Sequence, residues 1–509
     1  MSDSQSVTGE LRRLVKQSSQ YLTAMVVNLG LGFVSFPILT RVFSVADFGL
    51  IDLVQKVFLL LTATSKLGQQ NSALRFFNRE TFEKDPEQSR RYYSTMYLGV
   101  MGMGLGVTGL FAAIVWALPA TMLMPSLSSL LLFASALILL RAVQSILWSF
   151  LRIEERTGIY NVANVLLRAA TIGAVLFLLP RMGASAHTYF TATMGVEMLI
   201  VTALTFPLIT RGVLSLGSFD LTLFKSAILF GSPLVVQELA GIILDSGDRI
   251  LVQIYLGADA LGFYSVAYGL SSYVNTLMAT PLGLAILPIY LRIWNSHGRE
   301  KTVEFLSVGL DFFLMVSALI LAVVTVTAHD AVLLLASSKY QGADLLIPTL
   351  VAGLLVYTSH IFITAGLVIE KKTRPLAATL LYSALLNILL NMVLLPLIGL
   401  QGAAIATLIS YVFCTIYQAR ISFRVLPLKI EYRSVLNYVL AAIGAWGAGA
   451  AANFSRPVYN LFGKATVASG VYLILLLILD RRFRQRAAIA WHSVQSALFL
   501  NRSTLEAQS

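Results

Sequence analysis

Charged and amide side chains follow one face of a segment that is apolar enough to cross a membrane. In segment 47–73 the polar positions fall within an arc of about 140° when the chain is wound as a helix. They are Asp52, Gln55, Lys56, Thr62, Lys66, Gln69 and Gln70. A charge at bilayer depth is costly unless it faces a bundle interior or water. Lys56 and Lys66 could therefore hold an anion such as a phosphate, because each ammonium carries three hydrogen-bond donors.

A second segment, 226–250, repeats this design. Glu238, Gly241, Asp245 and Arg249 recur at helical spacing, with Asp248 beside them. The neighbouring segments carry neutral polar stripes, which comprise Tyr21 and Asn28 in segment 20–40 and Tyr264, Tyr268 and Asn275 in segment 260–291. Four helices at corresponding places are therefore predicted to present polar faces to one cavity.

The sign of the intramembrane charge differs between the two halves of the chain. The first half holds Lys56, Lys66, Arg141 and Arg168 against Asp52 and Glu197, and the second holds Glu238, Asp245, Asp248 and Asp311 against Arg249. A cationic half suits an anionic ligand, since Arg and Lys recognise phosphate. The four second-half carboxylates are candidate sites for a coupling cation, either a proton or sodium.

Several structural alternatives compete with these roles. Asp52 and Lys56 could form an ion pair within their own helix, as could Asp245 and Arg249. Arg249 and Asp248 could also extend to the membrane interface. Arg168 could form an ion pair with Glu197 and neutralise it inside the first half of the chain. Lys66 has no acidic residue one turn away, which favours an open cavity around it over pairing.

The composition requires a membrane environment for these elements. Of 509 residues, 57% are hydrophobic and 12% charged, against about 25% charged in soluble proteins. Such a chain is predicted to be an all-α polytopic membrane protein without a separate soluble domain. The apolar segments are 20–40, 47–73, 92–117, 123–150, 160–180, 186–209, 226–250, 260–291, 303–327, 341–368, 376–396, 400–423, 434–452 and 461–479.

Basic residues set the predicted topology. The loops on one side hold 27 Lys and Arg, those on the other hold 5, and 5 lie within spans. This asymmetry places both termini in the cytoplasm. The net charge of +12 is then an inner-leaflet signal and does not indicate a nucleic-acid partner.

An internal repeat suggests two lobes. Residues 153–183 align without a gap with 369–399, sharing an Ile-Glu pair and a Leu-Leu-Pro-x-x-Gly turn. Ala46-Asp47-Phe48-Gly49 is echoed by Ala260-Leu261-Gly262-Phe263. Six spans separate the copies, which predicts pseudo-symmetric six-helix lobes in the same orientation. The predicted regions are 1–216, 217–425, two additional helices in 426–480 and a basic cytoplasmic tail in 481–509.

Catalytic motifs are absent from the sequence. It has no Walker-type glycine loop, no His-Glu-x-x-His and no recognisable Ser/His/Asp context. The single cysteine, Cys414, lies in an apolar run and is expected to be a buried thiol. We therefore expect neither an enzyme nor a metal or cofactor site.

Three loop signatures resemble a known family: Phe36-Pro37-Ile38-Leu39-Thr40-Arg41 leading to Ala46-Asp47-Phe48-Gly49, Leu261-Gly262-Phe263-Tyr264-Ser265, and Pro396-Leu397-Ile398-Gly399-Leu400-Gln401-Gly402. They resemble the Wzx-type polysaccharide flippases of the multidrug/oligosaccharidyl-lipid/polysaccharide exporter superfamily. The resemblance implies a MATE-like fold and translocation of undecaprenyl-diphosphate-linked oligosaccharide by alternating access.

The resemblance also implies residue roles. Lys56, Lys66 and Arg249 match basic cavity positions and are assigned to the diphosphate, with Arg141 and Arg168 as weaker additions. Gly444, Gly447 and Gly449 would let the additional helices pack closely, as in the pair that guides the lipid tail in peptidoglycan-precursor flippases. Expected partners are the lipid-linked oligosaccharide, membrane lipid, the coupling ion and polysaccharide polymerase machinery.

Other functions stay open at this point. A peptidoglycan-precursor flippase has the same topology. An ion-coupled drug or cation antiporter of the same fold usually has twelve spans and an acidic site. A membrane glycosyltransferase or polymerase is disfavoured by the short outer loops.

Overall fold

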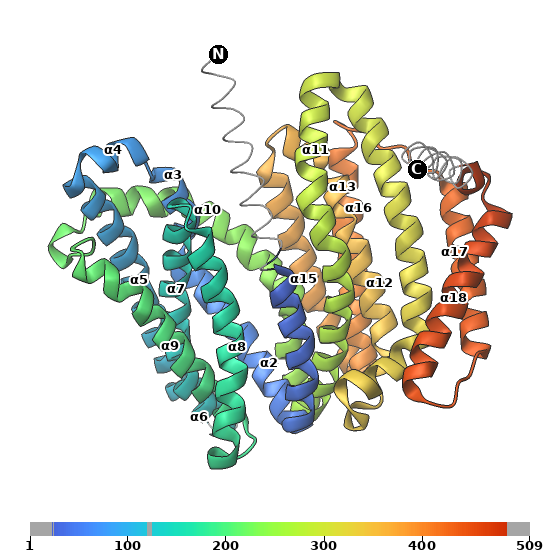
Figure 1. Cartoon of the computed structure of the whole chain (residues 1–509), viewed down its shortest axis with the longest axis horizontal. Coiled ribbons are helices and arrows are strands. Elements are labelled where there is room, and N and C mark those ends of the chain that lie inside the picture. The colour runs from blue at the N-terminus through green and yellow to red at the C-terminus, as the bar shows by residue number, and fades with distance from the viewer. Residues whose placement is uncertain (1–22, 24, 120–124, 486–509) are drawn as a thin grey trace, which may run out of the picture. The chain divides into compact units, whose positions relative to one another are not determined.

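A computed structural model describes residue 23, residues 25–119 and residues 125–485. Over these ranges the chain is helical and contains no strand (Figure 1). Tyr21 and most of the predicted basic tail lie outside the described residues. The all-α prediction is confirmed.

The helices follow one another with short connections. Their bounds are Met25–Val42, α2 Val45–Lys66, α3 Gln69–Phe76, α4 Arg79–Lys84, α5 Pro86–Ala117, α6 Pro125–Ala134, α7 Ala136–Ile153, α8 Thr157–Met182, α9 Ala186–Thr210, α10 Leu221–Ser246, α11 Asp248–Ala331, α12 Ile347–Thr358, α13 His360–Ile363, α14 Ala365–Ile369, α15 Thr373–Ile398, α16 Leu400–Ser422, α17 Tyr432–Ala451 and α18 Pro457–Leu479.

Side-chain caps fix where several helices begin. The Ser44 hydroxyl accepts from the Asp47 backbone N–H at the start of α2, and Ser185 accepts from Thr188 at the start of α9. Asp220 accepts from two backbone N–H groups of α10. Each cap satisfies donors that the first helical turn leaves unpaired.

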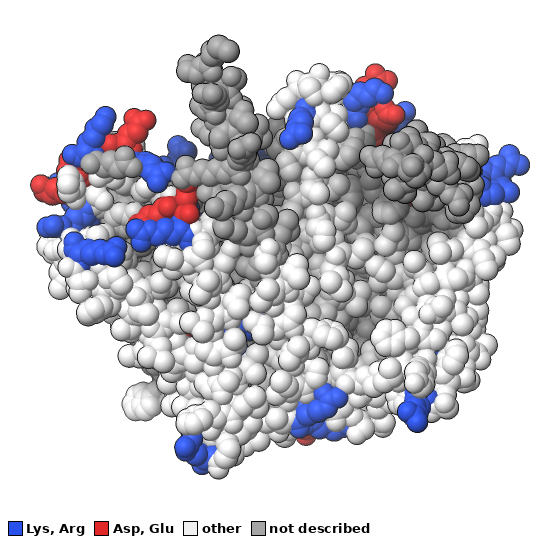
Figure 2. Space-filling view, in the orientation of Figure 1, with Lys and Arg blue, Asp and Glu red and all other residues white. Residues whose placement is uncertain are grey.

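The helices of the described residues agree with the predicted count of about fourteen. Among the described residues, eleven helical stretches are long and apolar enough to cross a membrane. One of them, Leu221–Ala336, extends over 116 residues and covers three predicted spans. Helix α2 is not one of the eleven stretches, and it covers the predicted span 47–73 as far as Lys66. In Figure 2, charged side chains gather near the helix ends and the surface between them is mostly uncharged. The chain is a multi-pass membrane protein.

The long helix α11 is divided by two glycines. Gly257 has a φ of 84° and Gly298 a φ of 75°, and a right-handed helix cannot continue through either value. Figure 1 shows α11 turning back on itself. The label α11 therefore covers three parts: residues 248–256, the predicted span 260–291 and the predicted span 303–327.

The prediction of one continuous span over 47–73 was wrong. Helix α2 ends at Lys66, and Leu67 and Gly68 have φ values of 42° and 72° before α3 begins. A Cβ at Gly231 of α10 would lie 2.5 Å from the Leu67 carbonyl oxygen. The break thus lets α10 cross within backbone contact distance.

The internal repeat is visible in the backbone. Helices α8 and α15 begin at Thr157 and Thr373 and end at Met182 and Ile398, which is the offset of 216 found in the sequence. Glu155 and Lys371 have left-handed φ values of 57° and 56°, and Gly183 and Gly399 have 74° and 64°. The two copies therefore share turn geometry as well as residues.

The chain divides into two compact units. Unit 1 comprises Met1–Ser265 and Leu380–Ala403, and unit 2 comprises Val266–Thr379 and Ala404–Ser509. In unit 1, Phe58 of α2 is fully buried and contacts the rings of Phe111 and Phe190 edge-on. The lobe boundary predicted at 216/217 stays a prediction.

Within unit 2, the additional helices α17 and α18 pack on each other and on α11. Gly449 approaches Val326 and Ala468, and Gly444 approaches Leu475, whereas no atom lies within 4 Å of a Cβ built at Gly447. Two of the three predicted glycines thus permit close packing. At the end of α11, Asp330 accepts from the Asn460 amide and contacts Lys464 at 3.3 Å.

Candidate functional site

A basic pocket of about 360 Å³ lies among four helices of unit 1. Its volume falls in the range of small-molecule sites, which is roughly 300–1,000 Å³. Helix α2 supplies Lys66 and α9 supplies Glu197. The full lining is Leu59, Thr62, Lys66, Arg141, Gln144, Ser145, Trp148, Arg152, Tyr160, Leu167 and Glu197.

Helix α7 provides most of the pocket's polar wall. Arg141, Gln144, Trp148 and Arg152 follow helical spacing and therefore share one face. Lys66 and Arg141 were predicted as anion-binding residues, but Gln144, Trp148, Arg152 and Tyr160 were not. The spacing of polar and aromatic residues along segment 141–152 is the sequence signal that could have identified this wall.

Each of the two deeper pocket cations has a carboxylate partner from another helix. Lys66 Nζ lies 3.0 Å from Glu238 Oε1 of α10, and the Gln70 amide donates to the other oxygen at 3.1 Å. The expectation that Lys66 sits unpaired was therefore wrong. Arg141 Nε lies 3.0 Å from Glu197 Oε1, so Arg141 takes the role of neutralising Glu197 that was considered for Arg168.

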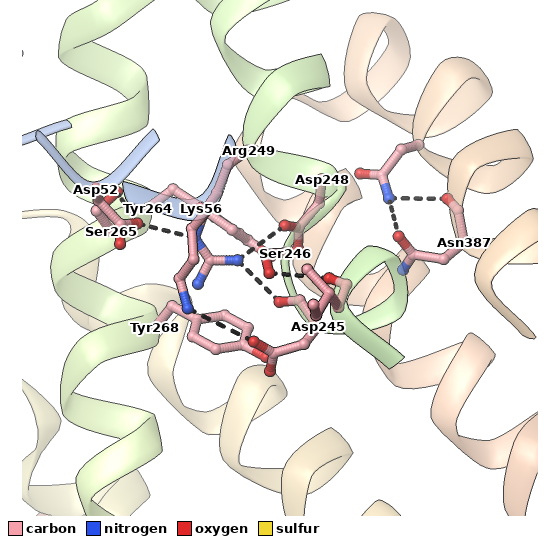
Figure 3. Close-up of polar contacts among 12 residues, drawn as sticks. Asp52, Lys56, Asp245, Ser246, Asp248, Arg249, Tyr264, Ser265, Tyr268 and Asn387 are labelled. Atoms are coloured by element: carbon pink, nitrogen blue, oxygen red, sulfur yellow. Dashed lines mark hydrogen bonds and ion pairs between the residues drawn. The ribbon is translucent and has the colours of Figure 1, made fainter. Parts of the chain in front are cut away.

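A second polar cluster lies between α2, α10 and the start of α11, also within unit 1 (Figure 3). Arg249 Nε donates to Asp52 Oδ2 at 2.8 Å, and its Nη1 lies 3.1 Å from Asp248 Oδ1. Tyr264 donates to Asp248, and Ser265 donates to Asp52. Arg249 is 1% exposed and Asp248 is 0% exposed. These values exclude the extension of Arg249 and Asp248 to the membrane interface.

The cluster pairs charges across helices. Lys56 Nζ lies 3.6 Å from Asp245 Oδ2, while Asp52 binds Arg249. The sequence allowed ion pairs within single helices, Asp52 with Lys56 and Asp245 with Arg249. The structure instead pairs each of the two α2 residues with a residue of α10 or α11. Arg249 does contact Asp245, but through its backbone carbonyl, at 2.9 Å.

Other predicted unit 1 residues lie away from the pocket lining. The Arg168 guanidinium donates to the Asn28 carbonyl oxygen at 3.0 Å. The Gln55 amide donates to the Tyr189 hydroxyl at 2.7 Å. Arg168 therefore contacts another helix and is not part of the pocket lining, whereas Lys66 and Arg141 are.

The predicted residues of unit 2 make contacts of their own. Tyr268 and Tyr411 share a hydrogen bond of 3.2 Å, and Thr358 donates to Asn275 at 2.6 Å. Asp311 accepts from Tyr438 at 3.0 Å and lines a separate pocket of about 650 Å³. That these side chains line a central cavity stays a prediction. Cys414 is buried, as predicted.

Comparison with solved structures identifies the fold. The MurJ lipid II flippase in an inward closed conformation has a TM-score of 0.67 and 15% identity, with 92% of this chain and 99% of that chain covered. An inward-facing multidrug resistance MATE family transporter of the MOP superfamily has a TM-score of 0.62 and 13% identity, covering 79% and 94%. The predicted MATE-like fold is confirmed.

Sequence comparison identifies the family. A probable low-salt glycan biosynthesis flippase, Agl15 of Haloferax volcanii, is 21% identical over 204 residues, which are 40% of this chain and 42% of that protein. The chain thus matches less than half of that relative's length. The profile of the polysaccharide biosynthesis protein family matches residues 14–294, more than half of the chain. The chain belongs to the polysaccharide biosynthesis protein family.

Proposed function

We propose that the chain flips undecaprenyl-diphosphate-linked oligosaccharide repeat units across the cytoplasmic membrane for surface polysaccharide biosynthesis. The supporting observation is the basic pocket, in which Lys66 and Arg141 lie between apolar helices, with the exposed Arg152 at its rim. Two cations at such a depth favour a ligand that carries more than one negative charge, and a diphosphate is such a ligand. Guanidinium and ammonium groups bind phosphate through charge-assisted hydrogen bonds.

Binding would change the ion pairs that hold α2 to α10. A diphosphate at Lys66 competes with Glu238, which lies 3.0 Å from the ammonium. Displacing Glu238 removes one of the links between the two helices and favours a conformation in which they separate. A ligand shifts a conformational equilibrium only by its differential affinity for the two states, and this competition supplies such a difference. We propose alternating access on this basis.

The displaced carboxylate offers a place for a coupling ion. Once Glu238 loses Lys66, a proton or sodium ion can neutralise it, since an unpaired charge inside the membrane is costly. Asp245 and Asp248 are likewise paired with cations, Lys56 and Arg249, and would need neutralising if those pairs opened. Asp311, in unit 2, is the fourth candidate.

Dithionite bleaching tests the flipping directly. The protein is reconstituted in liposomes that contain undecaprenyl diphosphate carrying a sugar labelled with the fluorophore NBD. Without flipping, external dithionite bleaches only the outer-leaflet half of the fluorescence. With active protein, we expect nearly complete bleaching. Lys66→Ala and Arg141→Ala should return bleaching to the outer-leaflet half, whereas Arg181→Ala, outside the pocket, should bleach like wild type.

A charge exchange separates binding from folding. Lys66→Glu with Glu238→Lys keeps an ion pair between α2 and α10 but moves the cation out of its place. We expect this double variant to melt like wild type and to lose flipping. Well-folded Lys66→Ala and Arg141→Ala proteins that bleach the probe at the wild-type rate would overturn the proposal.

The same liposomes distinguish the alternatives. Labelled lipid II tests peptidoglycan-precursor flipping, and uptake of a fluorescent organic cation tests drug antiport. The cations of the pocket disfavour a cationic substrate, so we expect no uptake of the dye. Growth of the sugar chain on the lipid would indicate a glycosyltransferase or polymerase and would contradict our proposal.

A further inference from the structure

The basic pocket contains polar groups that an anion does not explain. Gln144 is 8% exposed and Thr62 is 7% exposed, and both line the pocket. Gln144 Nε2 and Thr62 Oγ1 have no hydrogen-bond partner among the described residues. Buried polar groups are nearly always hydrogen-bonded in folded proteins. Because each atom has less than 1 Å² of accessible surface, a ligand in the pocket can supply the missing partner once the Gln144 and Thr62 side chains turn toward it by a change of rotamer.

An aromatic pair lines the same pocket. The rings of Trp148 and Tyr160 meet edge-to-face, with centroids 5.4 Å apart, and both side chains belong to the lining. An aromatic face carries negative charge and attracts partly positive hydrogens. The C–H face of a pyranose ring presents such hydrogens on an apolar surface. Its hydroxyls, at the ring edge, suit amide and hydroxyl groups.

The order of residues along α7 separates the two kinds of chemistry. Arg141 lies one turn before Gln144 and two turns before Trp148. A group held by Arg141 and Lys66 therefore lies next to Gln144 and Thr62, and a group beyond it lies against Trp148. This is the order of atoms in a glycosyl diphosphate, in which the first sugar follows the phosphates.

We infer that Gln144, Thr62, Trp148 and Tyr160 form a subsite for the first sugar of the lipid-linked glycan. The inference rests on the proposed function, because it takes the diphosphate as the ligand of Lys66 and Arg141. Gln144 Nε2 is a donor, so it binds a sugar oxygen, either a ring hydroxyl or the carbonyl of an acetamido group. The pocket then selects its substrate by the proximal sugar.

Binding to three lipids tests the subsite. The full-length protein in nanodiscs is titrated with undecaprenyl diphosphate alone, with the same lipid carrying one glucose, and with the same lipid carrying one N-acetylglucosamine. We expect wild type to bind a glycosylated lipid roughly tenfold more tightly than the bare one. Tighter binding of the acetamido sugar assigns Gln144 to its carbonyl, and equal binding assigns it to a hydroxyl.

The variants remove the subsite without touching the cations. Trp148→Ala and Gln144→Leu should bring the affinity for glycosylated lipid down to that for the bare lipid, which should itself be unchanged. Thr62→Val removes the hydroxyl at similar volume and should weaken the preference in the same direction. Trp116→Ala, an exposed tryptophan outside the pocket, should behave like wild type.

The outcomes distinguish failure of the subsite from failure of the proposed function. A sugar preference that survives in Trp148→Ala and Gln144→Leu overturns the subsite, as does wild type without any preference. An equal loss for bare and glycosylated lipid in Trp148→Ala also overturns it. If Lys66→Ala and Arg141→Ala leave the affinity for bare lipid unchanged, the diphosphate assignment itself fails.

Discussion

Four cations inside unit 1 each contact a carboxylate from another helix, and they are Lys56, Lys66, Arg141 and Arg249. Arg249 is the most buried of them, and it contacts Asp52 and Asp248 as well as the Asp245 carbonyl oxygen. Its planar guanidinium offers several donors in a fixed arrangement, which a lysine cannot reproduce. Arg249 therefore joins α2, α10 and the start of α11 through one side chain.

Removing this guanidinium should destabilise the protein. Arg249→Met leaves Asp248, which is 0% exposed, without its cation, and breaking a buried pair in this way costs about 3–5 kcal/mol. Arg249→Lys should lose less stability than Arg249→Met, because lysine keeps the positive charge although its single ammonium nitrogen cannot replace all the guanidinium contacts. Thermal unfolding in detergent measures both, with Arg181→Ala as the exposed control.

A double variant checks that the loss comes from the orphaned charge. Asp248→Asn with Arg249→Met removes the cation and the buried anion together, and Tyr264 can still donate to the Asn oxygen. We expect the double variant to melt above Arg249→Met alone. If Arg249→Met melts at the wild-type temperature, the buried cluster does not stabilise the fold.

Helix positions were predictable because hydropathy is a local property of the sequence. The ion-pair partner of each charged residue was not predictable in this way, since Lys66 and Glu238 are 172 residues apart in the sequence. Helical spacing placed Asp52 and Lys56 one turn apart, but their partners lie on α10 and α11. The wall formed by Gln144 and Trp148 was missed for a related reason, because neutral side chains in an apolar helix resemble packing residues.

Close helix crossings explain where the continuous-span prediction failed. The break at Leu67 and Gly68 brings backbone against Gly231. The two echoed signatures make a similar contact, because a Cβ on Gly49 would lie 2.6 Å from the Gly262 nitrogen. At these points the missing side chain permits the approach of two backbones.

Alanine substitution along α10 tests the crossing. Gly231→Ala places a Cβ 2.5 Å from the Leu67 carbonyl oxygen, whereas no atom lies within 4 Å of a Cβ at Gly241 on the same helix. The added methyl group would push α10 away from α2 and α3. We therefore expect Gly231→Ala to lower the melting temperature and to reduce the proposed flipping. Gly241→Ala should be neutral or slightly stabilising, because Ala favours a helix over Gly by roughly 1 kcal/mol. Equal melting of the two variants would contradict a tight crossing.

At the scale of the whole molecule, the repeat and the topology support each other. Turns at Glu155 and Lys371 match in φ, as do those at Gly183 and Gly399. An even number of spans between two copies gives them the same orientation in the membrane. Equivalent positions should therefore face the same side, and the distribution of basic residues predicts that Glu155 and Lys371 face the cytoplasm.

Cysteine labelling can test this sidedness with matched pairs. Cys414 is buried, so a Cys414→Ala background removes the native thiol at small cost. Arg156→Cys and Lys372→Cys are equivalent by the offset of 216, as are Arg181→Cys and Leu397→Cys, and all four positions are exposed. An impermeant maleimide should label Arg181→Cys and Leu397→Cys on intact cells. It should label Arg156→Cys and Lys372→Cys only after permeabilisation, because only an accessible thiol reacts. Labelling of the two members of either pair from opposite sides would show that the copies are inverted, and would exclude two lobes related by an axis along the membrane normal.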